Sequence, residues 1–368
     1  MKNKFKIILY FTLCFNIVFF TYVKSNEQFN FDVTEIEITN EGNYYKGLKR
    51  GIASTNDGNT IIKADTFDYN KITNILKASG NVIVDDLKKG IIITSKNITY
   101  FKNNEKIFTE GNSKATYDGT KIIANKFDYD IKKNVLIANE NVKVDDTIKN
   151  NIVYAEKITY LKNEEKILTT GTTEGILNLK YKFNSQNIII YRNKNLVKSS
   201  YFTSITDNNS TKYNLDNFVY NTEDEVLKAK GVEIITNYLK LKSDKFNFSS
   251  GFFNLKTYEF LGEETAVTVH KDIFDVLEND PRIVGTSSSG NKDEIVVNKG
   301  IFTSCKKNEN CPAWSIKAKR IKHDKKSKQL IYDQAFLNLY DIPVLYFPKF
   351  FHPDPTVKRQ SGFLQPQI

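Results

Sequence analysis

Proline is missing from most of this 368-residue chain, because all seven prolines lie at or after Pro281. Proline cannot donate a hydrogen bond to a β-ladder, so its absence from residues 26–280 favours a continuous, heavily hydrogen-bonded sheet. Arginine is scarce as well: of 53 basic residues, five are Arg, and the lysines alternate with Asp and Glu as on a solvated face. Proteins that read nucleic acids depend on Arg for bidentate contacts, so we expect no nucleic-acid partner.

Cysteine and histidine are too few and too scattered to form a metal centre. Cys14 lies in an N-terminal apolar run, which leaves Cys305 and Cys311, and the three histidines are spread over residues 270–352. An even number of cysteines in an exported chain favours a disulfide over a metal site. We therefore predict no metal and no cofactor, and treat each histidine as an ordinary surface or packing residue.

Enzyme motifs are also lacking. The segment 285–292 (GTSSSGNK) is similar to a phosphate-binding loop, but Asn291 stands where that loop requires lysine. Carboxylates such as Asp68 and Asp128 recur at a regular spacing, which is typical of solvated turns and not of one catalytic site. We predict no catalytic residues.

The first 25 residues have the layout of a secretory signal peptide. Lys2, Lys4 and Lys6 precede the apolar run Ile7–Val23, and a short cleavable end follows. The alternative is a retained anchor, although seventeen apolar-rich residues are barely enough to span a bilayer. Cleavage would remove four lysines and no acids, lowering the net charge from +10 to +6, which permits a mild attraction to anionic head groups.

The most informative positive feature is an internal repeat. Residues 62–86 recur sixty positions later as residues 122–146, with thirteen of twenty-five residues identical, and 98–111 recurs as 158–171, with ten of fourteen identical. A half-unit of about thirty residues lies inside each unit, as tyrosines show at positions 69, 100, 129, 160, 191 and 220. Four of them are followed eleven residues later by glycine, at 80, 111, 171 and 231. Such a period indicates one supersecondary unit stacked many times.

The repeating unit is predicted to be all-β. Short segments such as Phe67-Asp68-Tyr69 and Val82-Ile83-Val84-Asp85 alternate apolar and polar residues, are rich in β-branched and aromatic types, and end at Asn-rich turns. Two facing antiparallel sheets (a jellyroll) or a β-helix would both bury the apolar faces, and the repeat does not choose between them. We expect an N-terminal segment at 26–58, repeats at 59–280, a loop or boundary at 279–291, and a connecting β region at 281–341.

The last seventy residues resemble the LPS-assembly protein family (LptD, also called the OstA or organic solvent tolerance family). The matching motifs are FTSC at 302–305, W-x-I at 314–316, IPVLYFPKFFHPDPTVKR at 342–359 and SGFL at 361–364. The upstream repeat resembles the OstA/LptA-type β-jellyroll that precedes the barrel in that family. This part is less specific, because soluble LptA and single-span LptC share it.

The resemblance implies the periplasmic part of a lipopolysaccharide translocon at the outer membrane. The expected partners are lipopolysaccharide, an LptA-like bridge protein that pairs through an edge strand, and an LptE-like lipoprotein that plugs the barrel. Residues 342–368 would be a hinge and the first strand of a truncated outer-membrane barrel. The family often carries disulfides, so Cys305 is a candidate to pair with Cys311 or with a more distant partner, and both pairings stay open.

A lipid conduit needs an apolar trough along its length, and the repeat supplies candidates to line it. The candidates are five residues and their counterparts sixty positions later. They are Phe67, Tyr69, Leu76, Val82 and Val84, and then Phe127, Tyr129, Leu136, Val142 and Val144. The alternative for each is a plain core residue holding two sheets together, because a half-buried strand looks the same in both cases. The rival functions are a soluble LptA-like periplasmic carrier and, less well supported, a β-helix enzyme acting on carbohydrates.

Overall fold

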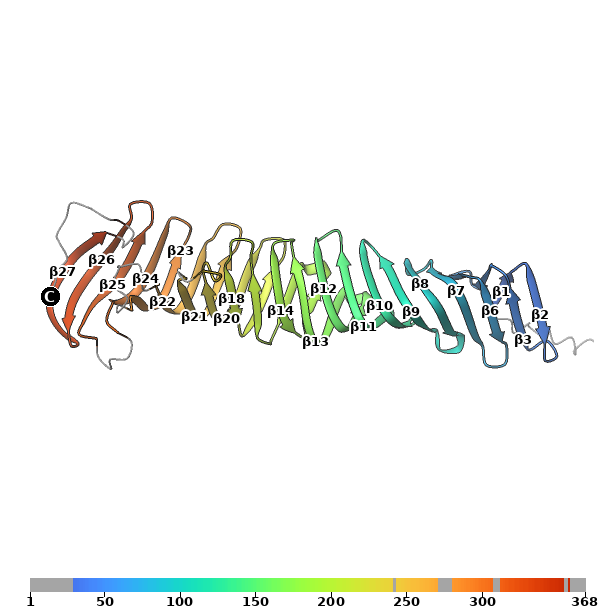
Figure 1. The fold of residues 1–368 in the computed structure, drawn as a ribbon. Helices are drawn as coiled ribbons and strands as arrows, with labels where there is room; N and C mark the ends of the chain where they lie inside the picture. The colour runs from blue at the N-terminus through green and yellow to red at the C-terminus, as the bar shows by residue number, and fades with distance from the viewer. Residues whose placement is uncertain (1–28, 241–242, 271–279, 307–311, 354–356, 358–368) are drawn as a thin grey trace, which may run out of the picture.

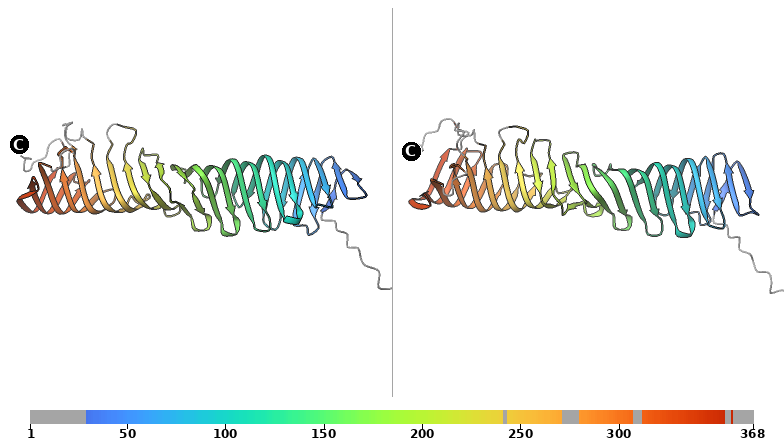
Figure 2. Two further views of the ribbon diagram at one scale, coloured as in Figure 1. Left: turned by 90° about the horizontal axis from the view of Figure 1, so that it is seen from below. Right: turned by 60° about the horizontal axis from the view of Figure 1, so that its bottom comes forward.

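The computed structural model describes residues 29–240, 243–270, 280–306, 312–353 and 357, and the predicted signal peptide lies outside this part. Within it the chain forms a long stack of β-strands that run across the stack axis, from β2 at one end to β27 at the other (Figure 1). Views from two further sides show the stack continuing from the N-terminal to the C-terminal strands (Figure 2). The prediction of an all-β chain is confirmed.

The first half of the stack contains fourteen strands and two short 3-10 helices. They are β1 (Phe29–Asp32), β2 (Glu35–Thr39), β3 (Tyr44–Leu48), β4 (Gly51–Thr55), β5 (Thr60–Ala64), β6 (Thr66–Asn70), β7 (Ile75–Asp86), β8 (Ile91–Phe101), η1 (Lys102–Asn104), β9 (Lys106–Tyr117), β10 (Thr120–Asp130), β11 (Val135–Asp146), β12 (Asn151–Leu161), η2 (Lys162–Glu164), β13 (Lys166–Leu177) and β14 (Tyr181–Gln186).

The second half contains the remaining strands and one more 3-10 helix. They are β15 (Ile189–Tyr191), η3 (Arg192–Lys194), β16 (Leu196–Ser199), β17 (Thr203–Thr206), β18 (Lys212–Leu215), β19 (Asn217–Asn221), β20 (Val226–Ile235), β21 (Lys245–Asn254), β22 (Phe260–Thr268), β23 (Arg282–Gly290), β24 (Glu294–Thr303), β25 (Trp314–Asp324), β26 (Gln329–Leu339) and β27 (Ile342–Pro353).

Each long strand bends at its middle and contributes to two layers. The register of β7 against β8 runs from Ile75 to Ser79, shifts, and resumes at Val82. The first half of β7 pairs with β6 and the second half with β5. The same shift recurs between β10 and β11 and between β12 and β13. The cross-section is therefore a V, whose bent corner we call the vertex. We name the layer that contains β6 layer A and the layer that contains β5 layer B.

All pairings among the described strands are antiparallel, from β1 with β4 to β26 with β27. A β-helix is built from parallel coils, so the structure supports the jellyroll and not the β-helix.

The repeated glycines lie at the vertex. Gly80 has φ +79°, and a Cβ added to it would come within 2.4 Å of an Asp65 carboxylate oxygen. The backbone in this left-handed region suits glycine, and a residue with positive φ gives the bulge that bends the strand. Asn81, the next residue at the same bend, also has positive φ, and so does Asn141 at the equivalent bend of β11. The glycine period seen in the sequence is thus the period of the bends.

At the open side of the V, which we call the mouth, turns connect successive strands within each layer. In layer A, the residue that ends each turn lies four or five positions after a repeated tyrosine and has positive φ. These residues are Asn74, Glu105, Asn134, Glu165, Asn195 and Glu225. Asn side chains also link successive turns, because Asn74 Nδ2 donates to Asn103 Oδ1 at 2.9 Å and Asn134 Nδ2 donates to Asn163 Oδ1 at 2.6 Å.

The space between the layers is filled by two apolar cores. The first core contains 42 buried residues of the described chain, from Phe29 to Phe253, in one connected cluster. The second core contains seven, from Val297 to Ala335. Hydroxyl groups line the inner side of the vertex, as in the contacts of Ser95 with Ser113 (3.0 Å) and Thr169 with Thr173 (2.7 Å).

The sequence predicts a loop or a boundary at segment 279–291, and the loop is wrong, because most of the segment is strand β23. The Ser and Gly residues there permit close packing instead of forming a turn. Ser288 is 3% exposed and its hydroxyl contacts that of Thr265 at 2.7 Å, while a Cβ on Gly285 would come within 2.3 Å of the Val297 side chain. Among the described residues, no helix is long and apolar enough to cross a membrane.

Candidate functional site: the interior and its seam

All ten predicted groove residues lie between the two layers and are at most 3% exposed. Layer A contributes Phe67, Tyr69, Leu76, Phe127, Tyr129 and Leu136, and layer B contributes Val82, Val84, Val142 and Val144. They all belong to the first core. The structure thus brings the whole set together in one interior, which is shielded from solvent in the described residues.

The repeated tyrosines form a row inside the mouth. Tyr100 and Tyr160 donate hydrogen bonds from their hydroxyls to Glu105 (2.7 Å) and Glu165 (2.9 Å), which end their own turns. Tyr129 instead donates to the Asp86 carboxylate of layer B at 2.9 Å. Burial, with these neighbouring carboxylates, raises the pKa of each of the three hydroxyls well above the ordinary value. The row therefore stays neutral at physiological pH.

Outside this row, side chains from the two sets of turns meet along a line that we call the seam. No described backbone segment crosses it, since each turn joins strands of one layer. The Tyr129–Asp86 bond spans 43 residues, and the other cross-seam partners are mostly 42–46 apart. This recurring separation is about one and a half times the thirty-residue half-unit, so the seam contacts recur with the same period as the repeat.

Arg192 is the centre of the seam. It opens the η3 turn in layer A, its side chain is 6% exposed, and its guanidinium reaches oxygens of both layers. Nη1 lies 2.6 Å from Glu165 Oε2 in layer A, while Nε lies 3.3 Å from Asp146 Oδ2 in layer B. Nη2 also donates to the Asp118 carbonyl at 3.1 Å. Burial lowers the pKa of Arg192, but Tyr160 and Asp146 outweigh it and the net direction is upward, so the group stays charged.

Lysines extend the closure on both sides of Arg192. Lys149 of layer B donates to the Arg192 carbonyl and to Asn195 Oδ1, the latter at 2.6 Å. Lys162 of layer A donates to the Lys89 carbonyl and lies 3.6 Å from the centre of the Tyr117 ring, both in layer B. Burial lowers the pKa of Lys162.

The seam continues towards both ends of the first core. On the C-terminal side, Lys180 pairs with Glu225 at 2.8 Å, and Asn178 donates to the Thr222 carbonyl at 2.9 Å. On the N-terminal side, the pKa of Asp57 is lowered to about 2, chiefly by the Thr55 hydroxyl, with a smaller contribution from Lys102 across the seam. Contacts across the seam therefore extend from Asp86, which accepts from Tyr129, to Glu225, which pairs with Lys180.

The second core is closed by aromatic rings. Phe302 of layer B lies 6.4 Å from Tyr332 and 6.0 Å from His352, both of layer A, measured between ring centres. The Tyr332 hydroxyl contacts His352 Nε2 at 2.9 Å. Nearby, the Cys305 backbone N–H donates to the Thr303 hydroxyl at 3.1 Å. Cys311 lies outside the described residues, so the predicted disulfide remains a prediction.

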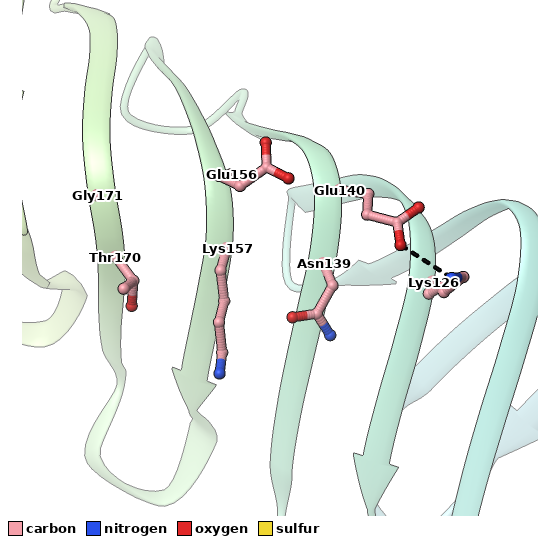
Figure 3. Close-up of a pocket in the computed structure, with 7 residues that line it drawn as sticks. All are labelled: Lys126, Asn139, Glu140, Glu156, Lys157, Thr170 and Gly171. Atoms are coloured by element: carbon pink, nitrogen blue, oxygen red, sulfur yellow. Dashed lines mark hydrogen bonds and ion pairs between the residues drawn. The ribbon is translucent and has the colours of Figure 1, made fainter.

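A separate groove of about 620 Å³ lies on the outside of the vertex (Figure 3). Apart from Gly171, its lining residues are polar or charged types, and two of them, Lys126 and Glu140, form an ion pair of 2.9 Å. Figure 3 shows the Lys157 side chain extending along its strand beside this groove. The groove shares no residue with the predicted lipid-lining set.

The sequence pattern correctly identified these ten residues as interior, while their role as a lipid lining stays a prediction, and it did not identify the seam. A signal was present, because a cation opens each of the three 3-10 turns: Lys102 and Lys162 recur sixty residues apart, and Arg192 directly follows the repeated Tyr191. The doubled acids Asp85-Asp86 and Asp145-Asp146 recur in step with them. Which cation meets which acid depends on the stagger between the layers, and the spacing within one layer does not contain it.

Comparisons with known proteins give partial matches. The chain is 26% identical over 165 residues to the LPS-assembly protein LptD of Paracidovorax citrulli, covering 42% of this chain and 18% of that protein. It is 26% identical over 133 residues to LptD of Idiomarina loihiensis, covering 34% of this chain and 16% of that protein. The chain thus matches less than a fifth of the length of these relatives. No family model matches.

Among solved structures, the chain is similar to that of LptH from Pseudomonas aeruginosa, the LptA-homologous periplasmic component of the lipopolysaccharide transport device. The TM-score is 0.26 and the sequence identity 20%, covering 28% of this chain and 75% of LptH.

Proposed function

We propose that this chain is a periplasmic lipid conduit, which passes lipopolysaccharide from a bridge of similar domains towards an outer-membrane barrel for assembly in the outer leaflet. It would be exported by its cleaved leader and work without a catalytic step. The partial matches to LptD and the motifs of residues 302–364 support the choice of lipopolysaccharide as cargo.

The observation that carries the proposal is the continuous first core, which extends from Phe29 to Phe253 without leaving the space between the layers. Burying apolar surface contributes about 0.8 kcal/mol per methylene, so one fourteen-carbon acyl chain exposed to water costs on the order of 10 kcal/mol. A long apolar interior whose layers part could accept such a chain at any point along the stack. A single closed pocket would hold it at one place only.

The two ends of the stack fit partners that add strands. Strand β2 is exposed along its whole length and pairs only with β3 among the described strands. At the far end, β27 pairs with β26 and exposes Ile342 and Leu345 by 66% and 55%. Unpaired edges accept further strands. We propose an LptA-like bridge protein at β2, and continuation into a barrel, with an LptE-like plug, beyond β27.

Photocrosslinking from adjacent residues on one strand tests the conduit. Ile107 is fully buried and faces the interior, whereas Phe108 is 38% exposed on the outer face of the same strand. A photoreactive phenylalanine at Ile107 should capture lipopolysaccharide in cells, and the same group at Phe108 should capture several-fold less. Equal capture at both positions, or none at Ile107, would contradict the proposal.

Proline substitutions test the bridge contact separately. In an antiparallel edge strand, alternate backbone N–H groups point outward, so of the two adjacent residues Ile36 and Glu37, proline at one removes an outward donor and proline at the other removes a donor to β3. We expect one of the two variants to lose capture of an LptA-like protein and the other to lose pairing with β3. Retained capture by both would exclude β2 as the docking edge.

A further inference from the structure

The two layers of the first core are joined covalently at the vertex, but only by side chains at the mouth. Every described strand that changes layer does so at the bend. At the seam, the layers meet through Arg192, Lys149, Lys162 and similar polar contacts. A V joined in this way has one line along which it can open without breaking a β-ladder.

We propose that the seam is a reversible electrostatic closure, with Arg192 as its central lock, and that acyl chains enter the first core sideways through it. This inference rests on the proposed function and adds how the interior is reached. The path lies between the layer A turns and the layer B turns near Glu165 and Asp146, and not through the ends of the stack.

The chemistry of Arg192 suits a lock that can release. Its side chain joins three acidic turns of both layers at once, through Glu165, Asp146 and Asp118. Holding buried charges together costs desolvation free energy that offsets most of their attraction. Such contacts fix one closed arrangement, yet add little net free energy against opening, because water can solvate both partners and another anion can take the place of a carboxylate. Removing Arg192 itself has a larger effect, since it leaves the buried carboxylates without a counter-charge.

An incoming lipid supplies such an anion. When the seam parts, Arg192 and Lys162 in layer A and Lys149 in layer B are left at the mouth. An anionic head group could pair with these cations while its chains pass inward over the tyrosine row. The positions of the cations outside the apolar interior therefore match a lipid whose charges stay at the surface.

The second core provides a contrast within the same stack. There the layers meet through Phe302, Tyr332 and His352. Aromatic rings of opposite layers also meet in the first core, as Tyr117 and Tyr160 do at 6.3 Å, so the feature that sets the first core apart is the charged seam around Arg192. Opening that depends on Arg192 is therefore expected in the first core.

A buried cysteine reports opening without any lipid. Ile158 is fully buried two residues from Tyr160, which contacts Arg192. In an Ile158→Cys variant, Arg192→Gln should raise the rate of maleimide labelling about tenfold or more, which corresponds to about 1.4 kcal/mol. Arg192→Lys keeps the positive charge but loses the planar guanidinium that donates to several partners at once, so it should raise the labelling rate by less.

Two controls separate opening from general destabilisation. Arg320 makes a 2.6 Å pair with Asp333 at a side chain that is 58% exposed, so Arg320→Gln removes the same chemical group away from the seam and should leave labelling unchanged. Ala335→Cys reports on the second core. If Arg192→Gln labels Ile158→Cys no faster than Arg320→Gln does, or labels Ala335→Cys equally fast, the lock is excluded.

Cross-linking the seam tests sideways access. Lys149 and Asn195 contact each other across it, so Lys149→Cys and Asn195→Cys together, joined by a short bismaleimide, should lower lipopolysaccharide capture at Ile107 several-fold, while each single variant treated alike should not. Undiminished capture after cross-linking would exclude sideways access but leave the conduit intact. If untreated protein captures no lipid at Ile107, both the conduit and this inference are wrong.

Discussion

The two cores of this stack use the same bent antiparallel strands but hold their layers together differently. The first core buries 42 apolar residues under a seam of charged and polar contacts. The second buries seven, and its layers meet through an aromatic cluster around Phe302 and Tyr332. Equal backbone topology thus coexists with unequal closure.

This difference separates two tasks that a lipid-handling stack must perform. Polar contacts at the mouth can exchange with water, so the seam of the first core can part while the β-ladders stay intact. Aromatic rings of opposite layers meet in both cores, as Tyr117 with Tyr160 in the first and Phe302 with Tyr332 in the second, and they resist opening in both. The charged seam, and not the presence of rings, is therefore what suits the first core to exchange of cargo.

The largest effect is expected from removing a buried ring in each core. Tyr129→Ala and Tyr332→Ala both delete fully buried tyrosines, and losing a buried aromatic ring typically costs about 3–5 kcal/mol. In a stack, stability is set mainly between neighbours, so each change should raise hydrogen exchange near its own strands. With seven buried apolar residues among those described, the second core should lose protection throughout residues 282–353. Uniform loss of protection along the chain in either variant would show that the two cores unfold as one unit.

Much of the fold could be predicted from the sequence, because strand ends, bends and buried faces depend on residue types that are close together in the chain. The tyrosine period marks strand ends and the glycine period marks bends, as Tyr69 and Gly80 illustrate. The apolar lining followed from alternation along strands such as Phe67-Asp68-Tyr69. Closure could not be predicted in this way. Whether Arg192 faces Asp146 or solvent depends on how far one layer is shifted along the other, which is a property of long-range packing.

Stability at alkaline pH is a second property in which the two cores should differ. Burial raises the pKa of Tyr100, Tyr129 and Tyr160 in the first core, and that of Tyr332 in the second. A group with a raised folded-state pKa contributes full stability below its unfolded pKa of about 10 and loses it as the pH rises beyond that value. Each such tyrosine can subtract up to about 1.4 kcal/mol per pH unit above 10.

With more of these tyrosines, the first core should lose stability more steeply above pH 10 than the second. Hydrogen exchange at fixed temperature across pH 9–11, corrected for its intrinsic pH dependence, would measure both regions in one sample. Parallel loss in the two regions would contradict the expectation. Tyr129→Phe offers a control, since it removes one titrating group but keeps the ring.

A smaller effect is expected at the vertex. Gly80→Ala places a Cβ 2.4 Å from an Asp65 oxygen at a φ of +79°, whereas Gly171 has a φ of +80° with nothing within 4 Å. Both changes carry the strain of the left-handed region, about 1–2 kcal/mol, and only Gly80→Ala adds a clash. The melting temperature should therefore fall further for Gly80→Ala.

In the second core, a residue other than glycine adopts positive φ at a bend: Lys299 of β24 has a φ of +47°. Lys299→Gly should therefore leave the stability unchanged or slightly raised, by up to about 1 kcal/mol. A marked loss in this variant would mean that the Lys299 side chain, and not the backbone conformation, holds that corner.

The smallest effect is expected for ion pairs outside the seam. Arg320→Gln breaks the exposed pair with Asp333, and exposed pairs contribute about 0–1 kcal/mol. The seam differs in burial, because Arg192 and Asp146 have side chains only 6% and 9% exposed. Chemical denaturation of Arg320→Gln should reproduce the parent midpoint within error, in low and in high salt. If it shifted the midpoint as much as Arg192→Gln does, burial at the mouth would not distinguish the seam from ordinary surface charge, and the contrast between the two cores would rest on their apolar contacts alone.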